Sequence, residues 1–85
     1  MRVSRIQLVR IRSVYRLTMA QLADELGCTS SAINRMEKGH DKISESMQAR
    51  IVDLFELNTN KLRAITKMYN KYQLPPKPEA KEAQE

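Results

Sequence analysis

Hydrophobic residues recur every three to four positions along most of the chain, a spacing typical of helices with one buried face. Near the start, Leu8, Ile11 and Tyr15 share such a face, and Ser4 and Gln7 stand at the spacing of a helix-capping box. The β-branched residues of this segment do not alternate with polar ones, so no strand is predicted. The pattern predicts five helices, at about residues 5–15, 19–26, 30–37 and 45–56, with a last one ending before residue 75.

Residues that favour the start or the end of a helix lie between these apolar segments. Thr18 and Gln21 again have capping-box spacing, and Gly27 supplies the left-handed backbone that ends a helix. A second glycine, Gly39, ends the following helix, and Ser44 can cap the one after it. We therefore expect the second and third helices to be joined by one tight turn.

The last predicted helix, which Asn58 or Asn60 can cap, carries an apolar stripe that is long for a small core. Its members recur at helical spacing and are Leu62, Ile65, Tyr69 and Tyr72. We expect this stripe to form a homodimer interface. The alternative is that the stripe closes the core of the monomer.

A single domain is expected to cover residues 1–74, because 85 residues provide one compact core. Residues 75–85 contain three prolines and no apolar side chain larger than alanine. Ordering them would cost more entropy than burial returns, so they are predicted to be a disordered charged tail.

Composition narrows the class of protein. Hydrophobic residues make up 41% and charged residues 29%, and no apolar run approaches the roughly 20 residues that a membrane span needs. No stretch of signal-peptide length follows the first residues, so we expect a cytoplasmic protein that does not bind membranes. The net charge is +5, and five arginines precede the first acidic residue, Asp24. Such a basic end either faces an anionic partner such as nucleic acid or simply stays solvated.

The candidate chemistry of the chain is sparse. Cys28 is the only cysteine and His40 the only histidine, so neither an internal disulfide nor a Cys/His zinc set is expected. No nucleophile motif contains the histidine, and there is no glycine-rich phosphate loop. We therefore expect no catalytic residue, no metal and no cofactor.

The most informative segment is residues 17–39, which has the order helix, glycine turn, helix. Ala23 is small enough for two helices to approach closely, and Gly27 reverses the chain. Apolar residues of both helices fill the corner between them, and small polar residues are left facing outward. These corner residues are Leu22, Leu26, Ile33 and Met36.

This segment resembles the Cro/CI-type (XRE-like) helix-turn-helix family of phage and bacterial regulators, over about residues 5–66 and most closely over residues 17–39. The resemblance is carried by Leu17, Gln21, Leu22, Ala23, Leu26, Gly27, Ile33, Glu37 and Gly39. It implies an all-α, five-helix lambda-repressor-like domain whose third helix enters the DNA major groove. It also implies a homodimer on a two-fold operator in double-stranded DNA.

The family pattern assigns base contacts to residues of the third helix. Ser30, Ser31 and Arg35 match the base-reading positions, Asn34 is a further contributor, and Thr29 is a cap that can touch a thymine methyl. A guanidinium such as that of Arg35 can bond guanine O6 and N7 together. The alternatives are a phosphate contact for Arg35 and local capping for the two serines.

Phosphate contacts are expected around the two helices, from Thr18, Lys38, His40 and Lys42. Met19 departs from the family, where glutamine is usual, so its contact is either lost or taken over by Gln21. A second departure is Glu56, where relatives commonly have glycine, so the turn between the last two helices is expected to differ or helix four to continue.

Arg12 and Glu37 stand where many relatives form a partly buried ion pair, and we interpret both as structural. Cys28 replaces a valine usual in relatives and is interpreted as a small buried hydrophobe. The leading hypothesis is a transcriptional repressor that occupies an operator. The alternative is an antitoxin-like interaction module whose main role is to bind a protein partner and whose DNA binding is secondary.

Overall fold

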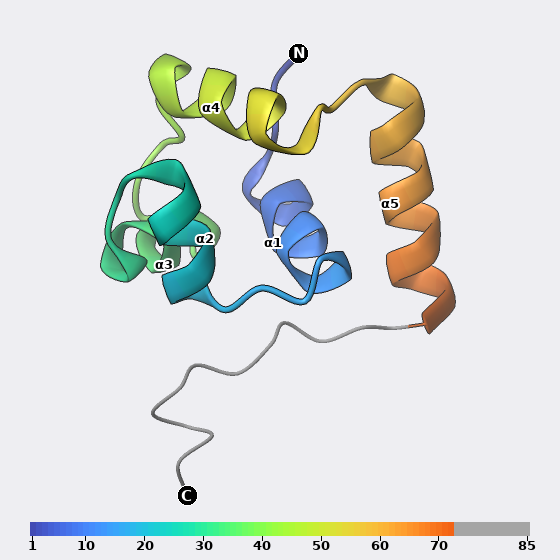
Figure 1. The fold of residues 1–85 in the computed structure, drawn as a ribbon, viewed down its shortest axis with the longest axis horizontal. Helices are drawn as coiled ribbons and strands as arrows, with labels where there is room; N and C mark the ends of the chain where they lie inside the picture. The colour runs from blue at the N-terminus through green and yellow to red at the C-terminus, as the bar shows by residue number, and fades with distance from the viewer. Residues whose placement is uncertain (73–85) are drawn as a thin grey trace, which may run out of the picture.

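The computed structural model describes residues 1–72, most of which are helical (Figure 1). The helices of this part of the chain are α1 (Arg5–Val14), α2 (Met19–Leu26), α3 (Ser30–Glu37), α4 (Glu45–Phe55) and α5 (Thr59–Tyr72). No strand occurs among them, which confirms the predicted all-α class with five helices. None of these helices is long and apolar enough to cross a membrane. The tail predicted at residues 75–85 lies outside the described residues.

Local capping explains where these helices begin. The backbone N–H of Gln7 donates to Ser4 Oγ at 3.1 Å, and the Ser4 N–H donates to Gln7 Oε1 at 2.9 Å, which completes a capping box. At α5 the cap is Asn58, whose Oδ1 accepts from the Lys61 N–H at 2.8 Å. Of the two candidate caps for this helix, Asn58 is therefore the one used.

The helix α1 lies between α5 and α3, while α2 packs against α3 and α4 (Figure 1). Each helix contributes buried apolar residues to one core, because most of the residues that recur at helical spacing point inward. The most completely buried apolar side chains are Leu8, Ile11, Leu22, Ile33 and Ile51. The inner face of α3 is thus held against α1 and α2, and its outer face remains exposed.

The turn between α4 and α5 places a glutamate in the conformation that glycine favours. Glu56 has φ 51° and ψ 51°, in the left-handed region, and α4 therefore ends at Phe55 and does not continue. Lys61 Nζ donates to the Phe55 carbonyl oxygen, and so supplies a hydrogen bond to one of the last carbonyl groups of α4, which have no donor within the helix. The turn keeps the shape of a glycine turn, and the Cβ of Glu56 makes that shape costly.

The apolar stripe of α5 is divided between the core and the surface. Leu62 and Ile65 are buried in the core of this chain, where they help to close the monomer, and a homodimer contact through the stripe stays a prediction. Tyr69 is half-buried, with the Arg10 guanidinium 5.8 Å from its ring centre. Tyr72 is 58% exposed. The core-facing side of α5 thus buries Leu62 and Ile65, while Tyr72, at the end of the helix, remains exposed.

Candidate nucleic-acid interface

The helix α2 starts at a second complete capping box. Thr18 Oγ1 accepts from the Gln21 N–H at 3.0 Å, and Gln21 Oε1 accepts from the Thr18 N–H at 2.9 Å. Both side-chain oxygens therefore serve the helix start. The Gln21 amide nitrogen is not used by the box, so the predicted phosphate contact of Gln21 would be made by that nitrogen.

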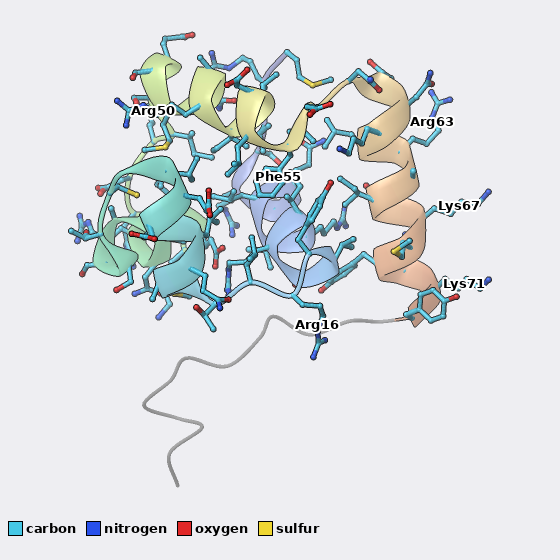
Figure 2. The ribbon with its side chains drawn as sticks, in the orientation of Figure 1. Arg16, Arg50, Phe55, Arg63, Lys67 and Lys71 are labelled. Atoms are coloured by element: carbon cyan, nitrogen blue, oxygen red, sulfur yellow. The ribbon has the colours of Figure 1, made fainter. Side chains whose placement is uncertain are left out.

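The turn between α2 and α3 combines a left-handed glycine with a contact from α4. Gly27 has φ 74°, and the Cys28 N–H returns to the Ala23 carbonyl oxygen at 2.9 Å. Arg50, on α4, donates from Nη1 to the Leu26 carbonyl oxygen at 3.1 Å (Figure 2). A cation at a helix C-terminus complements the helix dipole, so Arg50 helps to hold the turn in place.

Cys28 lies in this turn and is half-buried, packed against the core. Burial raises the pKa of its thiol, although the nearby Arg50 acts in the opposite direction. The thiol is therefore neutral at physiological pH. A reactive cysteine, in contrast, needs to be a thiolate.

The short helix α3 presents its polar residues on one side. Ile33, Met36 and Glu37 are buried against the rest of the molecule, and Thr29 Oγ1 caps the helix by accepting from the Ala32 N–H at 3.1 Å. The residues predicted to read bases point the other way: Ser30, Ser31 and Arg35 are exposed, and Asn34 is half-buried. Thr29 is exposed as well. The structure thus collects the predicted base-reading residues on and beside one exposed helix face.

Arg35 does not project freely from that face. Its Nε donates to Asp41 Oδ2 at 2.8 Å and its Nη2 donates to Asp41 Oδ1 at 3.0 Å. These hydrogen bonds lower the pKa of the Asp41 carboxyl and raise that of the Arg35 guanidinium. Because 56% of the Arg35 side chain and 46% of the Asp41 side chain are exposed, water screens this pair and a ligand can reach it.

The loop after α3 carries the other predicted phosphate contacts. Lys38, His40 and Lys42 are all exposed. Gly39 has φ 81°, and a Cβ at this position would lie 3.2 Å from the Arg5 side chain, so the loop also lies close to α1. The loop thus continues the exposed face of α3 with cationic side chains.

A buried ion pair joins the end of α3 to α1. Arg12 Nε donates to Glu37 Oε2 at 2.7 Å, and Nη2 donates to Oε1 at 2.9 Å. Arg12 Nη1 also donates to the Leu17 carbonyl oxygen at 3.1 Å, just before α2. One guanidinium therefore connects α1, the approach to α2 and the last residue of α3.

Two contacts of charged side chains at this site are not predicted by the sequence. The sequence indicates no partner for Asp41, because a separation of six residues across a turn matches no helical pairing rule. Arg50 lies 24 residues from the carbonyl that it caps. In both cases the sequence shows a charged residue that could contact a helix end or a nearby charge. It does not show which helix or which side chain that residue contacts.

Comparison with known proteins agrees with this geometry. A family model described as a helix-turn-helix domain matches residues 3–65, which is most of the chain. No curated protein and no solved structure matches the chain. The match covers α1 to α4 and half of α5, including the α2–turn–α3 unit. The chain therefore belongs to the helix-turn-helix domain family. In helix-turn-helix proteins that bind DNA, the second helix of the motif is the one that enters the major groove.

Proposed function

We propose that this protein is a cytoplasmic, sequence-specific regulator of transcription that places α3 in the major groove of double-stranded DNA. The observation that carries the proposal is the exposed polar face of α3, whose opposite side packs into the core. Ser31, Asn34 and Arg35 project from the side opposite Ile33 and Met36. Hydrogen-bonding side chains on an exposed helix are what direct reading of base edges requires.

The regulator is proposed to act as a repressor of the XRE-like type, with two copies on a two-fold operator that block access of the polymerase. Thr18, Gln21, Lys38, His40 and Lys42 would contact phosphates on either side of the α3 helix. Such contacts set the register of the protein on the duplex, while base contacts supply the specificity. No catalytic step is part of this function.

Selection of bound duplexes from a randomised DNA pool tests the proposal. The protein should enrich one consensus, with two related half-sites if it binds as a dimer. Arg35→Ala should then weaken binding by roughly 1–3 kcal/mol and relax the preference at one base position of each half-site. Lys38→Ala, the matched control, should weaken binding without relaxing any position. Recovery of random sequences only would contradict the proposal.

A second candidate is an interaction module of the antitoxin type, and features of α5 favour it. This helix contains no acidic residue, and Arg63, Lys67 and Lys71 point away from the bundle along its outer side (Figure 2). Met68 and Tyr72 are exposed beside them. A basic, partly apolar helix face suits an acidic protein partner. Copurification with one partner at a fixed stoichiometry, together with no sequence enrichment from the DNA pool, would support this candidate over the repressor.

A further inference from the structure

Asp41 is joined to Arg35 through both its main chain and its side chain. The N–H of Asp41 donates to the Arg35 carbonyl oxygen at 3.3 Å, beside the His40 N–H at 2.9 Å. The carboxylate accepts the two hydrogen bonds from the guanidinium. The backbone contact places the carboxylate where it meets the arginine of the preceding helix, so the pair is built into the turn.

The ion pair uses one particular edge of the guanidinium. The group is planar and offers five N–H donors in a rigid fork, and Asp41 takes the side edge formed by Nε and Nη2. The end edge keeps one N–H of Nη1 and one of Nη2, which are parallel. That end edge is not used by Asp41, and two parallel donors are what guanine O6 and N7 accept together.

We propose that Asp41 is a positioning residue for base recognition: it holds the side edge of Arg35 and thereby presents the end edge to a guanine in the major groove. This inference rests on the proposed function and adds to it the residue that makes the Arg35 contact specific. A free arginine must give up much rotamer freedom when it binds, whereas an arginine already held in place gives up less.

The charge of Asp41 strengthens the same selectivity. Arg35 lowers the pKa of the Asp41 carboxyl, so the group is ionised at neutral pH. An anion beside Arg35 repels phosphates and disfavours a purely electrostatic contact of Arg35 with the DNA backbone. Asp41 thus reduces the affinity for DNA of any sequence and favours the base contact.

The test compares Asp41→Asn with Asp53→Asn on the duplexes that the wild-type protein selects from a randomised pool. Asp53 is an exposed acid of α4, so its replacement changes the net charge equally at a distance from α3. Affinity is measured for the selected duplex and for its variants at the base pair whose preference depends on Arg35.

Asp41→Asn should reduce the preference for the selected base pair severalfold, by no more than Arg35→Ala does, since the whole bidentate contact provides roughly 5- to 150-fold discrimination. It should also bind a duplex of unrelated sequence more tightly than the wild type does. Asp53→Asn should leave the preference unchanged, and Asp41→Glu, which keeps both carboxylate oxygens, should restore part of it. In an Arg35→Ala background, Asp41→Asn should have no further effect on the preference.

An unchanged or sharper preference in Asp41→Asn overturns the inference alone, because Asp41 then competes with DNA for Arg35 or has no part in recognition. A wild-type protein that enriches no duplex overturns the proposed function as well. Circular dichroism of each variant verifies that it is folded, which is expected because both acids are exposed.

Discussion

Arg12 on α1 and Glu37 at the end of α3 form an ion pair whose side chains are only 3% and 5% exposed. Two hydrogen bonds of 2.7 and 2.9 Å join them, and burial makes the pair sensitive to the loss of either partner. The other ion pairs among residues 1–72, Arg2 with Glu45 and Arg35 with Asp41, are largely exposed. The buried pair therefore ties the end of α3 to α1.

Removing one member of this pair should destabilise the fold. Glu37→Gln leaves the Arg12 cation buried without its anion, and we expect the free energy of unfolding to fall by roughly 3–5 kcal/mol. Glu45→Gln, which removes an exposed carboxylate from its ion pair, should change it by less than about 1 kcal/mol. Chemical denaturation monitored by circular dichroism measures both. Equal losses of unfolding free energy in Glu37→Gln and Glu45→Gln would show that burial of the Arg12–Glu37 pair does not cause the destabilisation.

Replacing Glu56 by glycine should stabilise the protein. The left-handed conformation of Glu56 costs a residue with a Cβ roughly 1–2 kcal/mol, of which glycine recovers a part because it loses more entropy on folding. We expect a net gain of about 0.5–1 kcal/mol, visible as a higher melting temperature. Glu25→Gly, the same substitution within α2, should instead lower stability. A lower melting temperature for Glu56→Gly would contradict the backbone argument.

The Arg35–Asp41 pair predicts a particular titration. Hydrogen bonds from Arg35 lower the pKa of the Asp41 carboxyl below its ordinary value of about 3.9. Because the folded-state pKa is depressed, the stability from this pair is present above the ordinary value and lost as pH falls through the folded value. NMR titration of the Asp41 carboxyl should show this lowered pKa and its rise in Arg35→Ala. An identical pKa in both proteins would show that the pair is not formed in solution.

Binding to DNA should depend steeply on salt if Lys38 and Lys42 neutralise phosphates. Each phosphate contact contributes a slope of about −0.9 to the logarithmic dependence of affinity on salt. Lys38→Ala should therefore reduce the slope by about one contact. Lys67→Ala should not, because α5 lies on the far side of α1 from α3 (Figure 1). Equal slopes for wild type and Lys38→Ala, measured by titration at several salt concentrations, would remove Lys38 from the interface.

The exposed end of α5 should carry any homodimer contact. Tyr72→Asp puts a charge on the surface patch beside Met68, and we expect a dimer to shift toward monomer in sedimentation velocity while helical content is kept. Leu62→Asp should instead unfold the domain, because Leu62 is in the core. A Tyr72→Asp protein with the mass of the wild type would place the dimer contact elsewhere or show that none exists.

Several helix ends follow from sequence alone because the signals that set them are local. Ser4 with Gln7, and Thr18 with Gln21, satisfy free N–H groups within three residues of each other. Gly27 ends α2 through its own backbone preference. Such interactions need no knowledge of the rest of the fold, so α2, the turn and α3 were predictable with their exposed face.

Contacts between distant residues were decided only by the tertiary structure. Helical spacing marks Leu62 and Tyr72 as one stripe, but the way α5 crosses α1 buries the first and exposes the second. Spacing likewise gives no partner for Asp41, whose contact with Arg35 depends on the path of the loop after α3. Periodicity specifies which side of a helix is apolar, whereas the partner of each side chain depends on how helices cross and how loops return.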